Sequence, residues 1–219
     1  MRKLICAAGI LLITGCAVIA GPPPLAAGPF PASPVADTPI EAEAGGYTLD
    51  PRHTSVIWRV RHMNLSMYTA RFNSVEGKLT LDPAAPARSA LTVSIDAHSV
   101  DTGLKDKDGK ASFDTQIADV LGAAKTPKIT FTANTITRTG SRTGLVSGDL
   151  TMNGVTKPAV LETTFVNYAA RTALSAKPVI AFSGHAVIKR SNWGASNAIF
   201  SLFAGDEVEI IVEAEFNKD

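Results

Sequence analysis

Residues 54–62 read TSVIWRVRH and alternate between apolar and polar side chains with a period of two. This period is typical of a β-strand with one buried and one solvated face. One face carries Val56, Trp58, Val60 and His62. The other face carries Ile57, Arg59 and Arg61. Because a charged residue at every second position cannot point into a core, we expect the strand to turn Trp58 inward.

Similar strand patterns, separated by turn residues, continue along the chain. They fall at 68–81, 91–98, 128–137, 145–152, 155–166, 178–188 and 207–216. Asn153-Gly154 separates two of them and predicts a hairpin, because a tight primed turn needs positive φ at both positions. About eight strands at hairpin spacing predict an all-β fold, either an antiparallel sandwich or a barrel.

Two segments have helical rather than strand spacing. Residues 112–122, SFDTQIADVLG, place Phe113, Ile117 and Val120 on one face and predict a short helix between two strands. Residues 196–203 predict a further helical turn. We therefore expect one or two short helices beside the strands.

The N-terminal segment differs from the rest of the chain and predicts export. Residues 1–16, MRKLICAAGILLITGC, combine two basic residues, a short apolar run and small residues before a cysteine, as in a signal peptide. The apolar run is too short for a stable membrane-spanning helix. Residues 13–16 also resemble a lipobox, which would make Cys16 the acylated N-terminus of a lipoprotein. The alternative is ordinary cleavage further along, near Ala20.

The segment that follows predicts a tether rather than a domain. Residues 17–46 are rich in Pro, Ala and Gly, and such a segment cannot bury enough apolar surface to offset its ordering entropy. The remaining residues, 47–217, have the length of one ordinary domain. We expect this domain to lie in the periplasm, anchored to a membrane through Cys16, or to be secreted if Cys16 is removed.

Composition excludes several classes of site from the domain. Cys6 and Cys16 are the two cysteines of the chain and both lie in the leader, so the domain has no disulfide and no thiolate site. Arg2 and Lys3 also lie in the leader, which leaves 19 of the 21 basic residues to face 20 acidic ones. No block of Lys or Arg stands out. We therefore expect no nucleic-acid partner, and no anionic membrane bound by charge alone.

Seven short motifs follow one another in an order typical of one family. They are Tyr47-Thr48-Leu49-Asp50-Pro51, His53-Thr54-Ser55-Val56, Val60-Arg61-His62-Met63, Asp101-Thr102-Gly103, residues 127–131, residues 148–158 (GDLTMNGVTKP) and Arg190-Ser191-Asn192-Trp193-Gly194. Together they resemble the YceI-like family of secreted bacterial proteins, over essentially all of 47–216. One loop departs from the family pattern. Residues 107–111, KDGKA, stand where the family usually has Arg-Asp-x-His-Leu, so Lys110 and Ala111 replace the histidine and the leucine. A change of ligand choice or access would follow if this loop forms part of the cavity rim.

The resemblance implies a lipocalin-like antiparallel barrel whose apolar lumen holds a polyisoprenoid or similar long-chain lipid. It also implies a periplasmic or secreted location and no established catalytic activity. The implied ligand is an isoprenoid quinone, a polyprenyl lipid or another fatty amphiphile, with no cofactor. A homodimer is compatible with the family.

An eight-stranded barrel has room inside for side chains or for one slim ligand. The apolar residues that we expect to face the lumen are Val56, Trp58, Val60, Phe72, Leu91, Val93, Phe131, Phe165 and Phe182. A lumen lined by them would take a hydrocarbon chain and gain about 0.8 kcal/mol for each buried methylene. Composition alone favours the alternative that the same side chains fill the barrel. The resemblance favours the ligand.

Two polar residues are candidates for holding the head group of a ligand. His62 ends the apolar face of the first strand and could donate to a quinone oxygen, with a bond to a backbone carbonyl as the alternative. Arg190 suits a pyrophosphate, because a guanidinium binds phosphate bidentately. Arg61 lies on the outer face by alternation and is the weaker candidate. Ordinary surface charge is the alternative for both arginines.

No pattern predicts a metal or catalytic site. The four histidines of the chain, His53, His62, His98 and His185, are scattered and lack ligand spacing. Residues 106–109, DKDG, resemble the start of a calcium loop that lacks its final glutamate. Neither a GxSxG elbow nor a Gly-rich phosphate loop occurs. We expect a non-enzymatic protein that binds, transports or stores a lipid in the bacterial envelope. The alternatives are an envelope enzyme of stress defence or quinone chemistry that uses His62, and a structural barrel packed solid.

Overall fold

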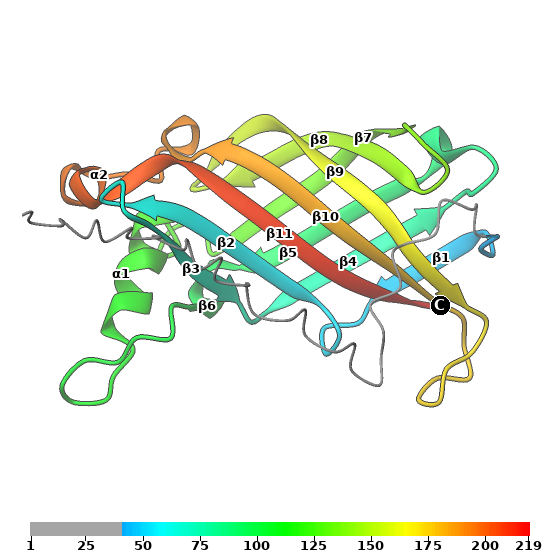
Figure 1. The fold of residues 1–219 in the computed structure, drawn as a ribbon, viewed down its shortest axis with the longest axis horizontal. Helices are drawn as coiled ribbons and strands as arrows, with labels where there is room; N and C mark the ends of the chain where they lie inside the picture. Colours follow the sequence, from blue (N-terminus) through cyan, green and yellow to red (C-terminus); the bar gives the residue numbers. More distant parts are fainter. Residues whose placement is uncertain (1–40) are drawn as a thin grey trace, which may run out of the picture. The chain divides into compact units, whose positions relative to one another are not determined.

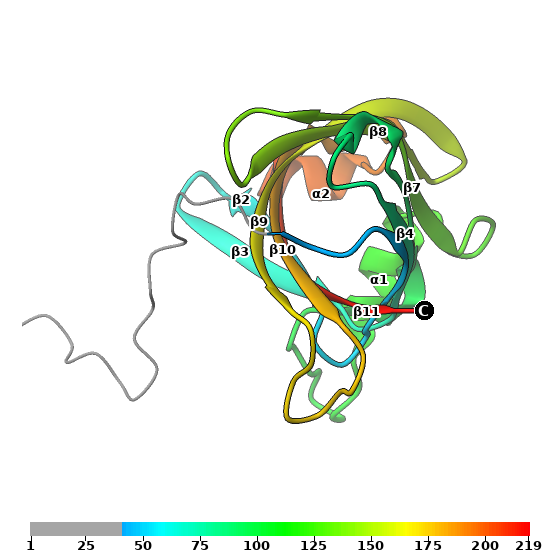
Figure 2. The same cartoon turned by 90° about the vertical axis from the view of Figure 1, so that its right-hand side faces the viewer.

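The computed structural model describes residues 41–219, in which the alternating segments form β-strands of one antiparallel sheet. The strands are β1 (Gly45–Leu49), β2 (Ser55–His62), β3 (Ser66–Phe72), β4 (Val75–Leu81), β5 (Ala90–Asp96), β6 (Val100–Asp101), β7 (Lys128–Arg138), β8 (Thr143–Met152), β9 (Val155–Ala169), β10 (Val179–Lys189) and β11 (Ala204–Lys218). From the side they run obliquely between two ends (Figure 1), and seen end on they close into a ring (Figure 2).

The eleven strands trace eight barrel strands, because three of these are broken into two pieces. β1 and β2 form one broken strand, and both pair with β11. β4 pairs with β1, and β3 pairs with β2. β5 pairs in turn with β4, and β6 pairs with β3. The pairing that opposes Tyr47 of β1 to Lys218 of β11 closes the ring. The prediction of an all-β, lipocalin-like antiparallel barrel of about eight strands with one or two short helices is confirmed.

The break between β1 and β2 has a local cause. Pro51 has no N–H to give to a strand ladder, so the ladder stops there. The carboxylate of Asp50 then turns the chain, because it accepts the Arg52 N–H at 2.9 Å and lies 3.0 Å from Nδ1 of His53. The chain resumes as β2 at Ser55.

Both predicted helices are present. α1 (Ser112–Val120) ends because Gly122 adopts φ +74°, a left-handed conformation that suits glycine. α2 (Ala198–Phe203) begins after Asn197, whose side chain accepts the N–H of Phe200 at 2.8 Å. Three short 3₁₀ turns, η1 (Pro86–Arg88), η2 (Ala97–Ser99) and η3 (Arg190–Trp193), complete the elements of the described range. In that range no helix combines the length and the apolar character needed to cross a membrane.

The predicted hairpin at Asn153-Gly154 joins β8 to β9, with positive φ at both residues. This turn also supports η3, because Nδ2 of Asn153 donates to the carbonyl of Trp193 at 3.2 Å. The indole N–H of Trp193 donates in turn to the carbonyl of Leu150 at 2.9 Å, and the ring is almost fully buried. The RSNWG segment is therefore fastened to the opposite hairpin.

The strands of the barrel lie between residues 45 and 218, and the predicted domain bounds 47–217 stay a prediction. β1 begins at Gly45, two residues before the predicted start at Tyr47, and β11 ends at Lys218. The predicted signal peptide 1–16, the lipidation site Cys16 and most of the tether 17–46 lie outside the described residues.

Candidate ligand-binding site

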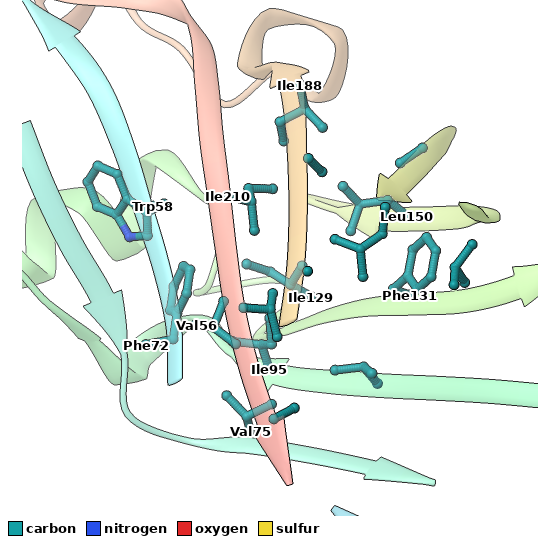
Figure 3. A pocket seen from close by; sticks show the side chains of 18 of the residues that line it. Val56, Trp58, Phe72, Val75, Ile95, Ile129, Phe131, Leu150, Ile188 and Ile210 are labelled. Atoms are coloured by element: carbon teal, nitrogen blue, oxygen red, sulfur yellow. The ribbon is translucent and has the colours of Figure 1, made fainter. Parts of the chain in front are cut away.

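The barrel encloses an apolar cavity of about 830 Å³ that extends along its interior. Figure 3 shows side chains from several strands converging on it, among them Ile188 of β10, Ile210 of β11 and Phe131 of β7. Every labelled side chain in this view ends in carbon except Trp58, which carries an indole nitrogen. The interior therefore offers almost no hydrogen-bond partners to a ligand.

Strand alternation explains why the wall is apolar. In β10 the residues at every second position, Phe182, Gly184, Ala186 and Ile188, border the cavity. The intervening His185 points away and lies 2.9 Å from a carboxylate oxygen of Glu209 on β11. The outer face is thus polar while the inner face is hydrocarbon, as expected for a barrel strand.

All nine apolar residues predicted to face the lumen border the cavity. These are Val56, Trp58, Val60, Phe72, Leu91, Val93, Phe131, Phe165 and Phe182. Their contact with a ligand stays a prediction. The alternative of a barrel filled by its own side chains does not fit the volume of this cavity.

Two aromatic groups line the cavity at different places. Near the helices, ring centroids follow one another at 6.2 Å from Trp58 to Tyr68, at 6.1 Å to Phe113 of α1 and at 6.0 Å to Phe200 of α2. On β9, β10 and β11, Phe182 lies between two further rings, with centroids 5.1 Å from Phe165 and 6.1 Å from Phe216.

The helix residues of this lining were missed by the sequence analysis. Helical spacing predicted an apolar face on α1, which includes Phe113 and Ile117, but it carried no signal that this face would cover one end of a barrel. Phe200 was missed for the same reason, since a single helical turn does not show which neighbour it packs against.

His62 lies at the end of β2, borders the cavity and is exposed to solvent. Among the described residues, no hydrogen bond holds its ring, so the alternative of a bond to a backbone carbonyl is not found. No carboxylate of the described residues forms an ion pair with it either. The imidazole can therefore donate to, or accept from, a polar group at the cavity mouth.

Arg190 also borders the cavity, but backbone carbonyls occupy much of its guanidinium. Its Nε, Nη1 and Nη2 donate to the carbonyl oxygens of Gly205 at 2.8 Å, Ala195 at 3.0 Å and Ala204 at 2.9 Å. These bonds fasten η3 to Ala195 and to the start of β11. Binding of a pyrophosphate by Arg190 stays a prediction, and it would have to use the remaining N–H groups. Arg61 is exposed and does not border the cavity.

Trp58 has one unusual feature. Its Nε1 is buried and has no hydrogen-bond partner among the described residues. A buried donor without an acceptor costs about 1–3 kcal/mol. The ring thus contributes apolar area to the wall, while its unpaired N–H lowers the stability of the fold.

The loop with the family departure touches the cavity through Leu104, and neither Lys110 nor Ala111 borders it. The carboxylate of Asp106 accepts the N–H groups of Asp108 and Lys110, each at 2.9 Å, so it organises the loop internally. A hydrogen bond from the Ser112 hydroxyl, followed by these N–H donors, lowers the pKa of Asp106. No group of side chains in residues 41–219 has the composition of a metal site.

Sequence comparisons show close relatives of this chain. The YceI-like domain model matches residues 47–216. A UPF0312 protein of Vibrio cholerae is 32% identical over 134 residues, which are 60% of this chain and 69% of that protein. Protein YceI of Escherichia coli O157:H7 is 35% identical over 127 residues, which are 57% of this chain and 64% of that protein.

Solved structures share the fold. Burkholderia cenocepacia BcnA is similar with a TM-score of 0.65 and 23% identity, over 76% of this chain and 98% of that chain. A Campylobacter jejuni YCEI protein has a TM-score of 0.59 and 27% identity, over 72% and 89% of the two chains. A polyisoprenoid binding domain from Saccharophagus degradans has a TM-score of 0.58 and 16% identity, over 79% and 98%. With the family model matching most of its length, this chain belongs to the YceI-like domain family.

Proposed function

We propose that the barrel binds one long-chain amphiphile, a polyisoprenoid or a similar lipid, with its chain inside the cavity. The observation that carries this proposal is the apolar interior of about 830 Å³. Cavities that bury small ligands measure about 300–1,000 Å³, so this one lies near the upper end of that range. The similarity in fold to the Saccharophagus degradans domain, which is described as polyisoprenoid binding, supports the same class of ligand.

The wall chemistry favours long hydrocarbon chains. Burial of about twenty methylenes would contribute about 16 kcal/mol before costs. Association costs about 4–15 kcal/mol in lost motion, so a short chain would gain little net affinity. Affinity should therefore rise with chain length until the cavity is full.

A polar head group would lie at the mouth, where the polar side chain of His62 borders the cavity. His62 is exposed there and has no partner among the described residues. A quinone or other oxygen could accept its N–H, while the tail extends inward past Trp58 and Val60. Loss of this bond in His62→Ala should weaken a quinone about fivefold to tenfold and leave a pure hydrocarbon unaffected.

We further propose that the protein carries or stores this lipid in the bacterial envelope without covalent chemistry. The predicted signal peptide 1–16 and the lipobox around Cys16 support a periplasmic location with a membrane anchor. A measured turnover that disappears in His62→Ala, while lipid binding is retained, would favour an enzyme instead.

Mass spectrometry of protein purified from its native envelope tests lipid binding. We expect a native mass above that of the polypeptide, a loss of this excess on denaturation, and a prenyl or fatty lipid in the solvent extract. Ala186→Phe, which adds a ring to the wall, should abolish the excess, whereas Val187→Phe on the outer face of β10 should retain it. A native mass equal to the bare polypeptide in several preparations would refute the proposal.

A further inference from the structure

Exposed apolar side chains gather at the end of the barrel that carries α2 and the β2–β3 turn. Of the eleven large hydrophobic residues exposed in residues 41–219, seven lie on the β2–β3 hairpin, at Leu104 or on α2. We define the mouth rim as six of them: Met63, Leu65, Leu104, Ile199, Leu202 and Phe203. A soluble surface normally scatters such residues singly, so their concentration at one end marks an interaction surface.

The mouth rim is continuous with the cavity. Leu104, Ile199 and Phe203 border the cavity and are also exposed to solvent. The N–H of Met63 donates to the carbonyl of Phe203 at 2.7 Å, which fastens the β2–β3 turn to α2. Leu65 is 77% exposed and Leu202 is 76% exposed, so both project outward beyond this junction.

We propose that the mouth rim docks on the surface of a lipid bilayer and opens the cavity toward the acyl chains. This inference rests on the proposed function, because a ligand with a long apolar tail gains a path from the bilayer to the cavity that avoids water. The transferred tail would pass Leu104, Ile199 and Phe203 before it reaches Trp58. A water-soluble ligand would not need an apolar rim.

Charge near the mouth rim is mixed, with exposed Asp106 and Asp206 beside two basic residues that can contact an anionic bilayer surface. Residues 191–205, which include α2, contain no charged side chain. Arg61 and Lys105, adjacent to the rim in sequence, are exposed and form no ion pair with any described residue. Each basic residue near an anionic membrane contributes about 1 kcal/mol, so charge would assist the apolar contacts without dominating them.

The length of the N-terminal segment permits this docking. β1 and α2 lie at opposite ends of the barrel (Figure 1), and β11, with 15 residues, spans about 50 Å between these ends. The 29 peptide units from Cys16 to Gly45 could extend at most about 100 Å. A chain acylated at Cys16 could therefore present its mouth rim to the same membrane.

Site-specific fluorescence tests the docking. The full chain with Cys6→Ser and Cys16→Ser has no thiol, so a single Leu65→Cys can carry a nitrobenzoxadiazole label. With vesicles of phosphatidylethanolamine and phosphatidylglycerol, we expect its emission to shift to the blue and to be quenched by brominated lipids. The control label at Leu174→Cys, in the β9–β10 loop at the other end, should stay in water. Because each label reports only its own surroundings, lipid binding by the N-terminal segment does not affect this comparison.

A second comparison measures the contribution of the rim. The protein labelled at Leu202→Cys should partition into the vesicles about tenfold less when Leu65 and Ile199 are both replaced by Ser. Both sites are exposed, so the fold should tolerate these substitutions.

The docking proposal is overturned if the label at position 65 stays in water with vesicles, or if the labels at positions 65 and 174 shift alike. It is also overturned if label 65 shifts without vesicles as protein concentration rises, which would indicate a second copy on the rim. Native mass spectrometry separates the two proposals, since lipid inside without docking overturns only the docking, and docking without bound lipid overturns only the proposed function.

Discussion

The two tryptophans of this chain differ in whether the buried indole N–H has an acceptor. The Trp193 N–H donates to the Leu150 carbonyl from an almost fully buried ring. The Trp58 N–H is buried without a partner. The same atom therefore stabilises the fold at one position and opposes it at the other.

This contrast predicts the cost of each Trp→Phe substitution. Trp193→Phe should lower the free energy of unfolding by about 2–4 kcal/mol, because it removes a buried hydrogen bond and leaves a void. Trp58→Phe should change it by less than about 1 kcal/mol, because the lost apolar contact is offset by the removal of an unpaired donor. Urea unfolding of both variants measures the difference, and equal losses would contradict the assignment of partners.

At the outer surface, Glu209 links three strands, and we expect it to make the stability of the barrel depend on pH. Hydrogen bonds from Arg59 of β2 and from His185 of β10 lower the pKa of Glu209 below its ordinary value of 4.5. A lowered pKa contributes stability that is present above the ordinary value and is lost as pH falls through the folded value. Arg59 and Glu209 are both partly exposed, so their ion pair should contribute less than about 1 kcal/mol to the free energy of unfolding.

Glu209→Gln should therefore lower stability at pH 7 and reduce the loss of stability between pH 5 and pH 3. Unfolding midpoints in urea across this pH range measure the slope. Glu207→Gln serves as the control, because Glu207 lies on the same strand, is exposed and forms no ion pair with a described residue. An unchanged slope in Glu209→Gln would show that the three groups do not interact in solution.

At the scale of the element, the β2–β3 turn combines two unfavourable features. Met63 has φ +48° and Asn64 has φ +57°, a left-handed conformation that is costly for a bulky residue such as Met63. The Met63 side chain is also more than half exposed, so its packing does not offset the backbone strain. Backbone strain at an exposed side chain points to a surface role for Met63 rather than to a role in stability.

Met63→Gly should accordingly raise the free energy of unfolding by about 0.5–1 kcal/mol, because glycine adopts this backbone without strain. The N–H that bonds to Phe203 is kept. The same substitution should weaken docking on vesicles. Thermal unfolding measures the gain in stability, and the vesicle assay measures the loss of docking. A loss of stability in Met63→Gly would show that the Met63 side chain packs in solution.

Local patterns predicted elements more completely than their connections. The alternation of Val56, Trp58 and Val60 predicted which face of β2 is buried, and Asn153-Gly154 predicted its hairpin, since both signals depend on neighbours in sequence. The shared use of β11 by β1 and β2 could not be predicted, because that register joins residues more than about 140 positions apart. The position of α1 and α2 at one barrel end was missed for the same reason.

At the scale of the molecule, the cavity determines how a ligand would affect stability. Ligand that binds only the folded barrel stabilises it by about 4 kcal/mol when present at a thousand times its Kd. For a domain of this size, that corresponds to a fall of about 10 °C in Tm on delipidation. Calorimetry before and after solvent extraction and refolding measures this fall. Restoration of Tm by added polyprenol is the control, and an unchanged Tm would indicate that the cavity holds no tightly bound lipid.

The nine lumen residues were predictable because a closed barrel turns one face of every strand inward. The role of Arg190 was less predictable, since its three carbonyl partners lie on both sides of α2, at Ala195 and at the first two residues of β11. The cavity itself could not be predicted from composition, because the same apolar residues could also have packed against one another.

The seam between β1 and β11 also governs how the protein can fold. Tyr47 meets Lys218 across 171 positions of sequence, so ring closure joins the first and last strands of the domain. Contacts of such high order form slowly, and no shorter N-terminal fragment can complete the ring. Until the last strand arrives, the hydrocarbon wall stays open to water and prone to aggregation. The barrel can therefore close only once β11 is available to pair with β1. A chain lacking β11 should be a substrate for chaperones and proteases rather than a smaller barrel.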